Sequence, residues 1–344
     1  MQRPVTNLIR SIWSGRWFEE SIVNSFKDIK TLVAAGWIQG AIPPALLVVL
    51  ILIVEVAAPG FLSGDTLLLL LSNTAVVFIL AAGVTFVILI GGIDLSIQSV
   101  ASLASVILAQ LLPKIGIMAF PVAILSGLVF GILSGYVHVR LKVPSFVATL
   151  ATGGVVAGIA LWAAAGRAIT IEQAGRENTA WVNGTLAGLP TVIWIAAVIG
   201  VLAFVGLRYT RFGRHSLAVG AGEPAAIAAG INVERTKIVA FAISGMLAAV
   251  AGTILAARLS SGSPNLANQL LLPAIAAVIV GGTAITGGLG GVARTAVGAL
   301  IISIVRIGMT FVGINIFAEN VVFGAVLILA VAITIDRSKI AIIK

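Results

Sequence analysis

The feature that most constrains this chain is a series of long apolar runs separated by short polar stretches. We count ten runs, at residues 41–58, 66–90, 97–112, 116–139, 143–165, 189–207, 236–257, 270–286, 292–314 and 317–335. A helix needs about 20 residues to cross the hydrocarbon core of a bilayer. Hydrophobic residues make up 60% of the 344 and charged residues 10%, which is more apolar surface than a water-soluble domain of this length could hide. The pattern predicts an all-α, polytopic membrane protein with about ten transmembrane helices.

Two of the runs, 97–112 and 270–286, are short for a full crossing. Both touch glycine pairs, so we expect broken or re-entrant helices there rather than simple spans. The chain has 38 glycines in all. Small residues let membrane helices approach closely, and this packing is the expected role of most of them.

The basic residues predict the orientation of the chain in the membrane. If the N-terminus is inside and the chain crosses ten times, 16 of the 21 Lys and Arg residues fall on the inner side and four on the outer side. Loops rich in Lys and Arg stay in the cytoplasm. We therefore expect both termini in the cytoplasm. The same distribution explains the net charge of +9 without any binding to nucleic acid.

The predicted transmembrane domain covers residues 41–337, which leaves an extension at each end. Residues 1–40 place Ile9, Trp13 and Trp17 at helical spacing with arginines between them, as in an amphipathic helix on the inner membrane face. A plain solvated extension is the alternative. This segment does not resemble a secretory signal, because it carries three acidic residues and has no cleavage pattern. Residues 338–344 form a predicted cytoplasmic tail.

The most unusual stretch is F-V-I-L-I-G-G-I-D-L-S-I-Q, at residues 86–98. An apolar run reaches the pair Gly91 and Gly92, the carboxylate of Asp94 follows at once, and the next run is apolar again. A carboxylate inside a membrane must cap a helix, pair with another group or face a cavity. We expect Asp94 to cap the next helix by accepting from the amide of Ser96 or Ile97. Capping does not exclude a place beside a translocation pathway, since broken helices use the same geometry.

A second glycine-rich stretch, V-I-V-G-G-T-A-I-T-G-G-L-G-G at residues 278–291, is similar to the first. Here an apolar run reaches Gly281 and Gly282, and Thr283 follows. The likeness between the two stretches is consistent with a structural repeat, or with glycine pairs that meet the same packing need twice.

The inner loop at residues 208–235 contains signals for a short helix. Pro224 suits the first helical position, Glu223 lies near the positive end of the helix dipole, and Gly230 ends the pattern. Ala225 and Ala226 begin its small-residue body. Such a helix on the cytoplasmic face would offer a shallow knob to another protein. An ordinary surface turn is the alternative.

Several motifs of other protein classes are missing from the sequence. There is no G-x-x-x-x-G-K-[ST] phosphate loop, no H-E-x-x-H and no cysteine, so neither ATP binding of that type, nor a metal site, nor a set of catalytic groups is predicted. Few ionisable residues fall within the apolar runs. Proton or sodium relays normally place carboxylates at mid-membrane, so a neutral polar solute is the better expectation.

Four motifs together resemble the inner-membrane permeases of ribose-type ABC importers. G-G-I-D-L-S at residues 91–96 is a hallmark of that family, and V-P-S-F-V-A-T-L at 143–150 resembles its next motif. The inner loop, with F-G-R at 212–214 and G-I-N-V at 230–233, and the glycine cluster from Gly281 also agree with it. The match runs in order from about residue 46 to residue 337. Gln98 stands where the family often has glycine, which leaves the exact sugar open.

The resemblance implies a division of labour among several chains. This chain would form the pathway for a monosaccharide by alternating access and would not itself be an enzyme. ATP and Mg²⁺ would bind a separate ATPase, which would dock on a coupling helix formed by Glu223, Pro224, Ala225, Ala226 and Gly230. A periplasmic protein would deliver the solute, and a second permease chain, identical or related, would complete the pathway. These expectations place the chain in a bacterial inner membrane.

The polar and glycine residues near the breaks are the candidates for lining or gating the pathway. They are Asn73, Thr85, Gly91, Gly92, Asp94, Ser96, Gln98, Gly281, Gly282 and Thr283. A nucleoside, a polyol or a signalling furanose is an alternative solute for the same class of importer. A carrier or channel that works without ATP is the alternative class, and it would need no docking helix on the inner side.

Overall fold

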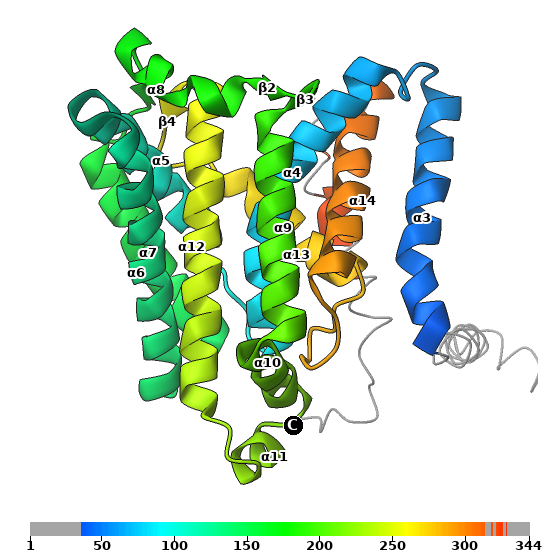
Figure 1. The fold of residues 1–344 in the computed structure, drawn as a ribbon, viewed down its shortest axis with the longest axis vertical. Helices are drawn as coiled ribbons and strands as arrows, with labels where there is room; N and C mark the ends of the chain where they lie inside the picture. The colour runs from blue at the N-terminus through cyan, green and yellow to red at the C-terminus, as the bar shows by residue number, and fades with distance from the viewer. Residues whose placement is uncertain (1–35, 314–317, 319–320, 326–327, 329–344) are drawn as a thin grey trace, which may run out of the picture.

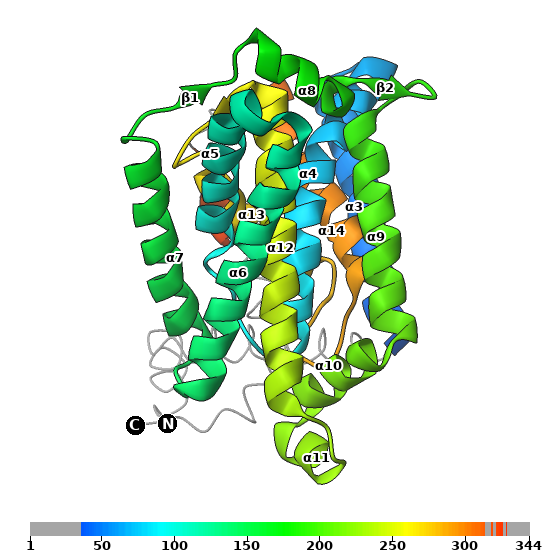
Figure 2. The same cartoon turned by 60° about the vertical axis from the view of Figure 1, so that its left-hand side comes forward.

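The computed structural model describes residues 36–313, 318, 321–325 and 328, and over these residues it is a bundle of helices with two short strand pairs. Figures 1 and 2 show the long helices running roughly side by side between two ends. One end carries α8 (Gln173–Asn183) and the strands, and the other carries α10 (Arg211–Ala221) and α11 (Glu223–Ala228). The predicted all-α, polytopic architecture is confirmed.

Six stretches are long and apolar enough to cross a membrane. They are α4 (Gly64–Leu89), α5 with α6 (Ile97–Ile115 and Ala119–Arg140), α7 (Ser145–Ala163), α9 (Thr191–Tyr209), α12 (Val233–Leu259) and α14 (Val292–Phe311). Two further apolar helices are shorter, within α3 (Gly36–Ala57) and at η2–α13 (Asn268–Leu270 and Leu271–Val280). The count of about ten crossings is therefore not confirmed within the described residues, and most of the last predicted run, 317–335, lies outside them.

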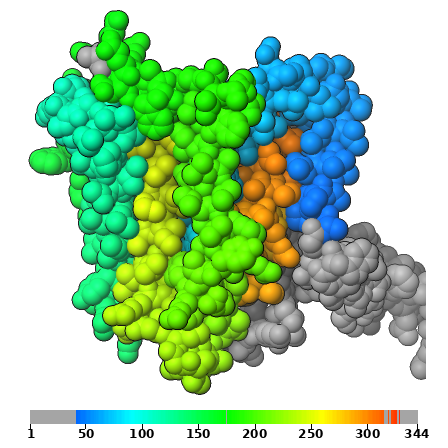
Figure 3. Space-filling view, viewed as in Figure 1, coloured from blue at the N-terminus to red at the C-terminus, as the bar shows by residue number. Residues whose placement is uncertain are grey.

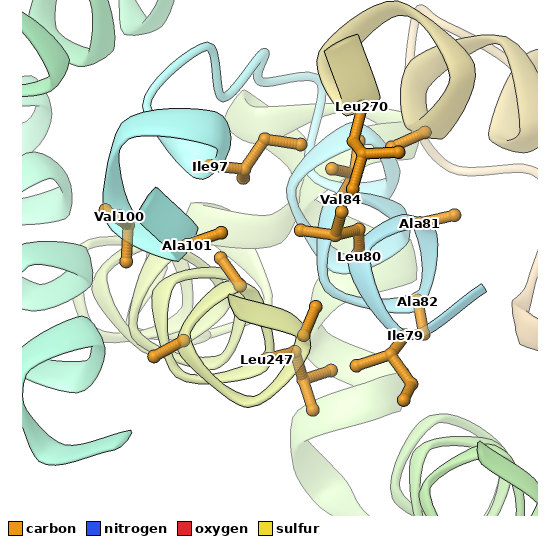
Figure 4. Close-up of a cluster of buried hydrophobic side chains, with 14 of the residues drawn as sticks. Ile79, Leu80, Ala81, Ala82, Val84, Ile97, Val100, Ala101, Leu247 and Leu270 are labelled. Carbon is orange, nitrogen blue, oxygen red and sulfur yellow. The ribbon is translucent and has the colours of Figure 1, made fainter. Parts of the chain in front are cut away.

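The core of the bundle is built around α4. Its residues from Thr74 to Leu89 are all buried, and it packs against α12, α13, α14 and α9. Figure 4 shows Leu80 and Val84 of α4 facing Ile97 of α5, Leu247 of α12 and Leu270. A helix that is apolar on every side belongs at the centre of a bundle. The cluster in Figure 4 therefore joins helices from both halves of the chain.

Glycines bring α6 and α12 together, as the abundance of glycine predicts. Gly127, Gly131 and Gly135 recur every four residues along one side of α6. A Cβ atom on Gly127 would overlap the carbonyl oxygen of Gly245, and one on Gly131 would overlap that of Phe241. This spacing of small residues is a known means of close packing in membranes.

The strands lie at the end of the bundle opposite α11. β1 (Ile169–Thr170) pairs antiparallel with β4 (Ser261–Gly262), with Ile169 opposite Gly262. β2 (Thr185–Leu186) pairs with β3 (Leu189–Pro190) in a small hairpin. The β1–β4 pair ties the segment after α7 to the end of α12.

The two short runs behave differently. The run at 270–286 contains a helix of only ten residues, α13, as expected for a broken segment. The run at 97–112 lies within a longer helix of 19 residues, α5, which includes Pro113 and Lys114 and ends at Ile115. The first break therefore lies between α4 and α5, and α5 itself is not shortened. The extension at 1–40 lies outside the described residues except for 36–40, which form the start of α3, and the tail at 338–344 lies wholly outside them.

Candidate functional site

Hydroxyl groups from α7 hold the first break together. α4 ends at Leu89 and α5 begins at Ile97. The N–H groups of Gly91 and Gly92 still donate to the last turn of α4, but those of the next residues need partners outside the two helices. The N–H of Ile93 donates to Ser145 Oγ at 3.0 Å, and the N–H of Leu95 donates to Thr149 Oγ1 at 3.1 Å. Non-helical backbone at membrane depth needs such partners. The G-G-I-D-L-S and V-P-S-F-V-A-T-L motifs therefore form one structural unit.

Asp94 lies at the centre of this unit with 1% of its surface exposed. Its Oδ1 accepts from the N–H of Ser96 at 2.9 Å and from the hydroxyl of Ser96 at 2.6 Å. Its Oδ2 accepts from the hydroxyl of Ser244, on α12, at 2.7 Å. The predicted contact with the amide of Ser96 is present, but the predicted capping role is wrong: Ser96 itself is the N-cap residue of α5, and no side chain caps this helix. The bond to Ser244 means that the carboxylate also fastens the break to a helix from the other half of the chain.

The second break and the inner loop meet the first break at a junction of glycines. The N–H of Gly288 donates to the carbonyl of Leu89 at 2.9 Å. A Cβ on Gly220 would overlap that same carbonyl, and a Cβ on Gly287 would lie 2.7 Å from the nitrogen of Gly91. The three segments can approach this closely because Gly91, Gly220, Gly287 and Gly288 carry no side chains. We call Gly91, Gly220, Gly287 and Gly288 the glycine junction.

Hydrogen bonds within the second break hold it in a compact loop beside the glycine junction. α13 ends at Val280, and Gly282 adopts a φ of +94°, which lets the chain turn. The hydroxyl of Thr283 accepts from the N–H of Gly291 at 3.3 Å. The guanidinium of Arg294 donates to the carbonyl of Gly282 at 3.3 Å. The loop between α13 and α14 is thus a folded unit, as the first break is.

The structure divides the candidate pathway residues into two groups. The side chains of Thr85, Asp94, Ser96 and Thr283 are buried among protein groups, and Thr85 bonds to Thr295 of α14 at 2.7 Å. Gly92 and Gly281 are buried, Gly282 is half-buried and Gly91 is exposed. Asn73 and Gln98 are half-buried, and neither side chain has a hydrogen-bond partner among the described residues. These two amides are the members of the set whose polar groups are free to meet a solute.

The predicted short helix of the inner loop is present as α11 (Glu223–Ala228), with Pro224 in its first turn. Gly230 has a φ of +75° just after its end, a left-handed conformation that glycine adopts without strain. Figures 1 and 2 show α11 as the outermost element at its end of the bundle, and Figure 3 shows the α10–α11 region projecting there. Of its residues, Ala226 is buried, while Glu223, Pro224 and Ala225 are exposed.

An ion pair and a groove connect α11 to the ends of two long helices. Lys237 of α12 and Glu223 approach to 2.6 Å, and Arg140 of α6 and Glu234 approach to 3.3 Å. A groove of about 510 Å³ lies beside these pairs, between α11, the start of α12 and the α6–α7 connection. Exposed ion pairs contribute little stability. The Glu223–Lys237 pair links α11 to α12, and the Arg140–Glu234 pair links α6 to α12.

Sequence reasoning missed several residues that complete these units. Ser145 and Thr149 were part of a recognised motif, but nothing in their spacing indicated that they bind the first break. Ser244 is a lone hydroxyl in an apolar helix, and that isolation is the one local signal that could have marked it. Gly220 carried no signal, because its partner Leu89 is distant in the sequence. Lys237 carried none because no helical spacing relates it to Glu223, which lies on a separate helix.

The comparisons with known proteins agree with this architecture. The model of the family described as branched-chain amino acid transport system / permease component matches residues 66–331. The chain is 39% identical over 291 residues to the ribose import permease protein RbsC of Haemophilus influenzae, which covers 83% of this chain and 90% of the relative.

Two relatives from Escherichia coli K12 extend the comparison. RbsC of that organism, also a ribose import permease protein, is 33% identical over 310 residues, or 88% of this chain and 95% of the relative. The L-arabinose transport system permease protein AraH is 35% identical over 261 residues, or 75% and 78%. The apolar helices, the two glycine breaks and these matches lead to one conclusion: the chain is a multi-pass membrane protein that belongs to this permease family, and its resemblance to ribose-type ABC importer permeases is confirmed.

Proposed function

We propose that this chain is the transmembrane permease subunit of an ATP-driven ABC importer that carries a monosaccharide into a bacterial cell across the inner membrane. The observation that supports this most directly is the projecting helix α11, seated on α12 by the Glu223–Lys237 ion pair. A permease that works alone has no use for such a helix. The ribose and L-arabinose named for the relatives make a small sugar the first solute to test.

In this proposal the energy for transport comes from another chain. A separate ATPase that binds ATP and Mg²⁺ docks on the coupling helix, which consists of α11 with Gly230. A periplasmic binding protein delivers the solute at the end that carries α8 and the strands. A second permease chain, identical or related, completes the pathway, and both termini face the cytoplasm. Alternating access follows when movement of the coupling helix tilts the segments at the two glycine breaks.

The substrate pathway is proposed to run past the half-buried amides of Asn73 and Gln98. Both can donate and accept hydrogen bonds, as sugar hydroxyls require. Few such groups are needed, because an importer with a delivery protein can keep most of its affinity in that protein. The buried candidates Thr85, Asp94, Ser96 and Thr283 then act on the pathway by holding the breaks in place, together with Gly91, Gly92, Gly281 and Gly282.

The experiment that tests the proposal is a mild purification of the tagged chain from native membranes, followed by reconstitution in vesicles. We expect an ATPase to accompany the chain, and we expect uptake of labelled ribose or L-arabinose to require ATP and the binding protein. If the chain purifies alone and vesicles take up sugar without ATP, the chain is a stand-alone carrier and the proposal is wrong. If the complex is ATP-driven but moves a nucleoside, a polyol or a signalling furanose, the class stands and the solute changes.

A further inference from the structure

Ser244 and Lys237 lie on the same side of α12, seven residues apart. Seven residues make almost two full turns, so the two side chains point in nearly the same direction, about 10 Å apart along the helix. Lys237 contacts Glu223 of the coupling helix at 2.6 Å. Ser244 contacts Asp94 of the first break at 2.7 Å. One rigid helix therefore touches both the coupling helix and the break through polar groups.

The surroundings of Ser244 make its contact with the break specific. Gly83 of α4 lies against Ser244, since a Cβ there would be 3.1 Å from the Ser244 Cα. Phe241, one turn earlier on α12, is fully buried beside Gly92. The Ser244 hydroxyl is the group on the described part of α12 that donates to Asp94. The other two hydrogen bonds of the carboxylate come from Ser96, within the break itself.

We propose that α12 transmits movement of the coupling helix to the first break, through the Glu223–Lys237 contact at one end and the Ser244–Asp94 contact within the bundle. This inference rests on the proposed function, because it assumes that an ATPase moves α11. Ser244 is then a positioning residue for the break and does not touch the solute. Asp94 anchors the break to the helix that the ATPase moves, which gives the buried carboxylate a role apart from the lining of a pathway.

The geometry favours α12 over the other routes from the inner end to the break. The glycine junction also joins α10 to both breaks, but its contacts are close approaches of backbone and one hydrogen bond from Gly288 to Leu89. A hydrogen bond to a buried carboxylate is stronger and more directional than such contacts. Movement along α12 would therefore pull on Asp94 directly.

The test uses the complete complex with its ATPase and a reporter in the break. The chain has no cysteine, so Leu95→Cys gives a single thiol beside Asp94, and its rate of labelling by a maleimide is measured with and without ATP. We expect ATP to change the rate in this background. Ser244→Ala should remove most of that change, because the hydrogen bond that joins α12 to Asp94 is lost.

Matched variants separate transmission from a general loss of stability. Thr253→Val removes another buried hydroxyl of α12, one that donates only to Val250 of its own helix, and should leave the ATP-driven change intact. Lys237→Met should weaken the change as Ser244→Ala does, whereas Arg235→Met, which removes a charge two residues away, should not. The Ser244→Ala complex should still contain the ATPase and hydrolyse ATP at the basal rate.

The outcomes are distinct. If no ATPase accompanies the chain, the proposed function fails before this test begins. If the ATPase is present and Ser244→Ala responds to ATP like the background, or if ATP leaves the background unchanged, the transmission through α12 is wrong while the importer remains. If Thr253→Val loses the response as well, the loss reflects a general weakening of α12. The proposal that the Ser244–Asp94 contact transmits the movement is then wrong.

Discussion

At the scale of single residues, the main feature of the site is a set of hydroxyl side chains that accept hydrogen bonds from backbone N–H groups. These N–H groups have no helical partner because the glycine breaks interrupt the helices. Ser145 and Thr149 supply hydroxyls to the first break, and Thr283 supplies one to the second. In a membrane each unpaired N–H group carries a free-energy penalty that water would remove elsewhere. The breaks therefore depend on short hydroxyl side chains as well as on glycines.

Thr149→Val tests this view of the first break. It removes the hydroxyl that accepts from the N–H of Leu95, and the buried donor left behind should lower the free energy of unfolding by about 1–3 kcal/mol. The measurement is the midpoint of thermal unfolding in detergent. Thr74→Val is the control, because Thr74 donates only to the carbonyl of Leu70 in its own helix and its loss strands no donor. Equal midpoints for the two variants would contradict the prediction.

Gly220→Ala tests the glycine junction. The added Cβ would overlap the carbonyl of Leu89 and crowd the nitrogen of Gly288, and overpacking of this kind lowers stability by about 1–3 kcal/mol. The same measurement applies. Gly206→Ala makes the same change where no atom lies within 4 Å of the new Cβ, and it should leave the midpoint unchanged or raise it, since alanine favours helix over glycine.

At the scale of elements, α12 is the helix that packs most extensively against other described helices. It packs against α4, α5 and α6, begins just after α11 and ends just before the β1–β4 strand pair. Its closest partner is α6, through the glycines at 127, 131 and 135. The backbones of these two helices therefore lie in close contact over three turns of α6.

Gly131→Ala should weaken that pair. A Cβ at this position would overlap the carbonyl of Phe241 and approach the Cα of Ala242 to 3.0 Å, so α6 and α12 would have to separate. We expect a lower unfolding midpoint in detergent. Gly154→Ala on α7, where nothing lies within 4 Å, serves as the comparison. A Gly131→Ala midpoint at or above that of Gly154→Ala would show that the close approach is dispensable.

The coupling helix carries an apolar side chain that a partner can bury. Ile227 is 60% exposed, and Ile227→Glu should reduce both recovery of the ATPase and sugar-stimulated ATP hydrolysis by about tenfold, because a charge would enter an apolar contact. Leu186→Glu is matched to it, since Leu186 is 59% exposed at the opposite end of the bundle. Full recovery of the ATPase with Ile227→Glu would show that α11 is not part of the surface on which the ATPase docks.

At the scale of the whole molecule, the sequence predicted the class and the breaks better than the contacts between them. The apolar runs gave most helix boundaries to within a few residues, because a bilayer restricts helices by length. The position of α11 followed from Glu223, Pro224 and Gly230, which are local signals. The Asp94–Ser244 bond and the glycine junction could not be predicted, because they depend on how segments distant in the sequence pack. The cytoplasmic placement of the termini stays a prediction.

Orientation can be tested directly in the cysteine-free chain. Ala225→Cys on α11 and Leu186→Cys on β2 are both exposed, at opposite ends of the bundle. In intact cells with a permeable outer membrane, a maleimide that cannot cross the inner membrane should label Leu186→Cys at once and Ala225→Cys only after lysis. Labelling in the reverse order would show that the molecule has the opposite orientation in the membrane, with α11 outside the cell membrane.

The ten-residue α13 has a consequence for how the protein is made. At 1.5 Å per residue it spans about 15 Å, roughly half of the hydrocarbon core, so it is too short to enter the bilayer as an independent span. The segment that precedes it is held by α5, where the N–H of Ala267 donates to the hydroxyl of Ser102, and the loop that follows it is held by the carbonyl of Leu89. Both partners belong to the first half of the chain. We therefore expect α13 to enter the membrane only after α4 and α5 are in place, since the segments on either side of it bond to those two helices.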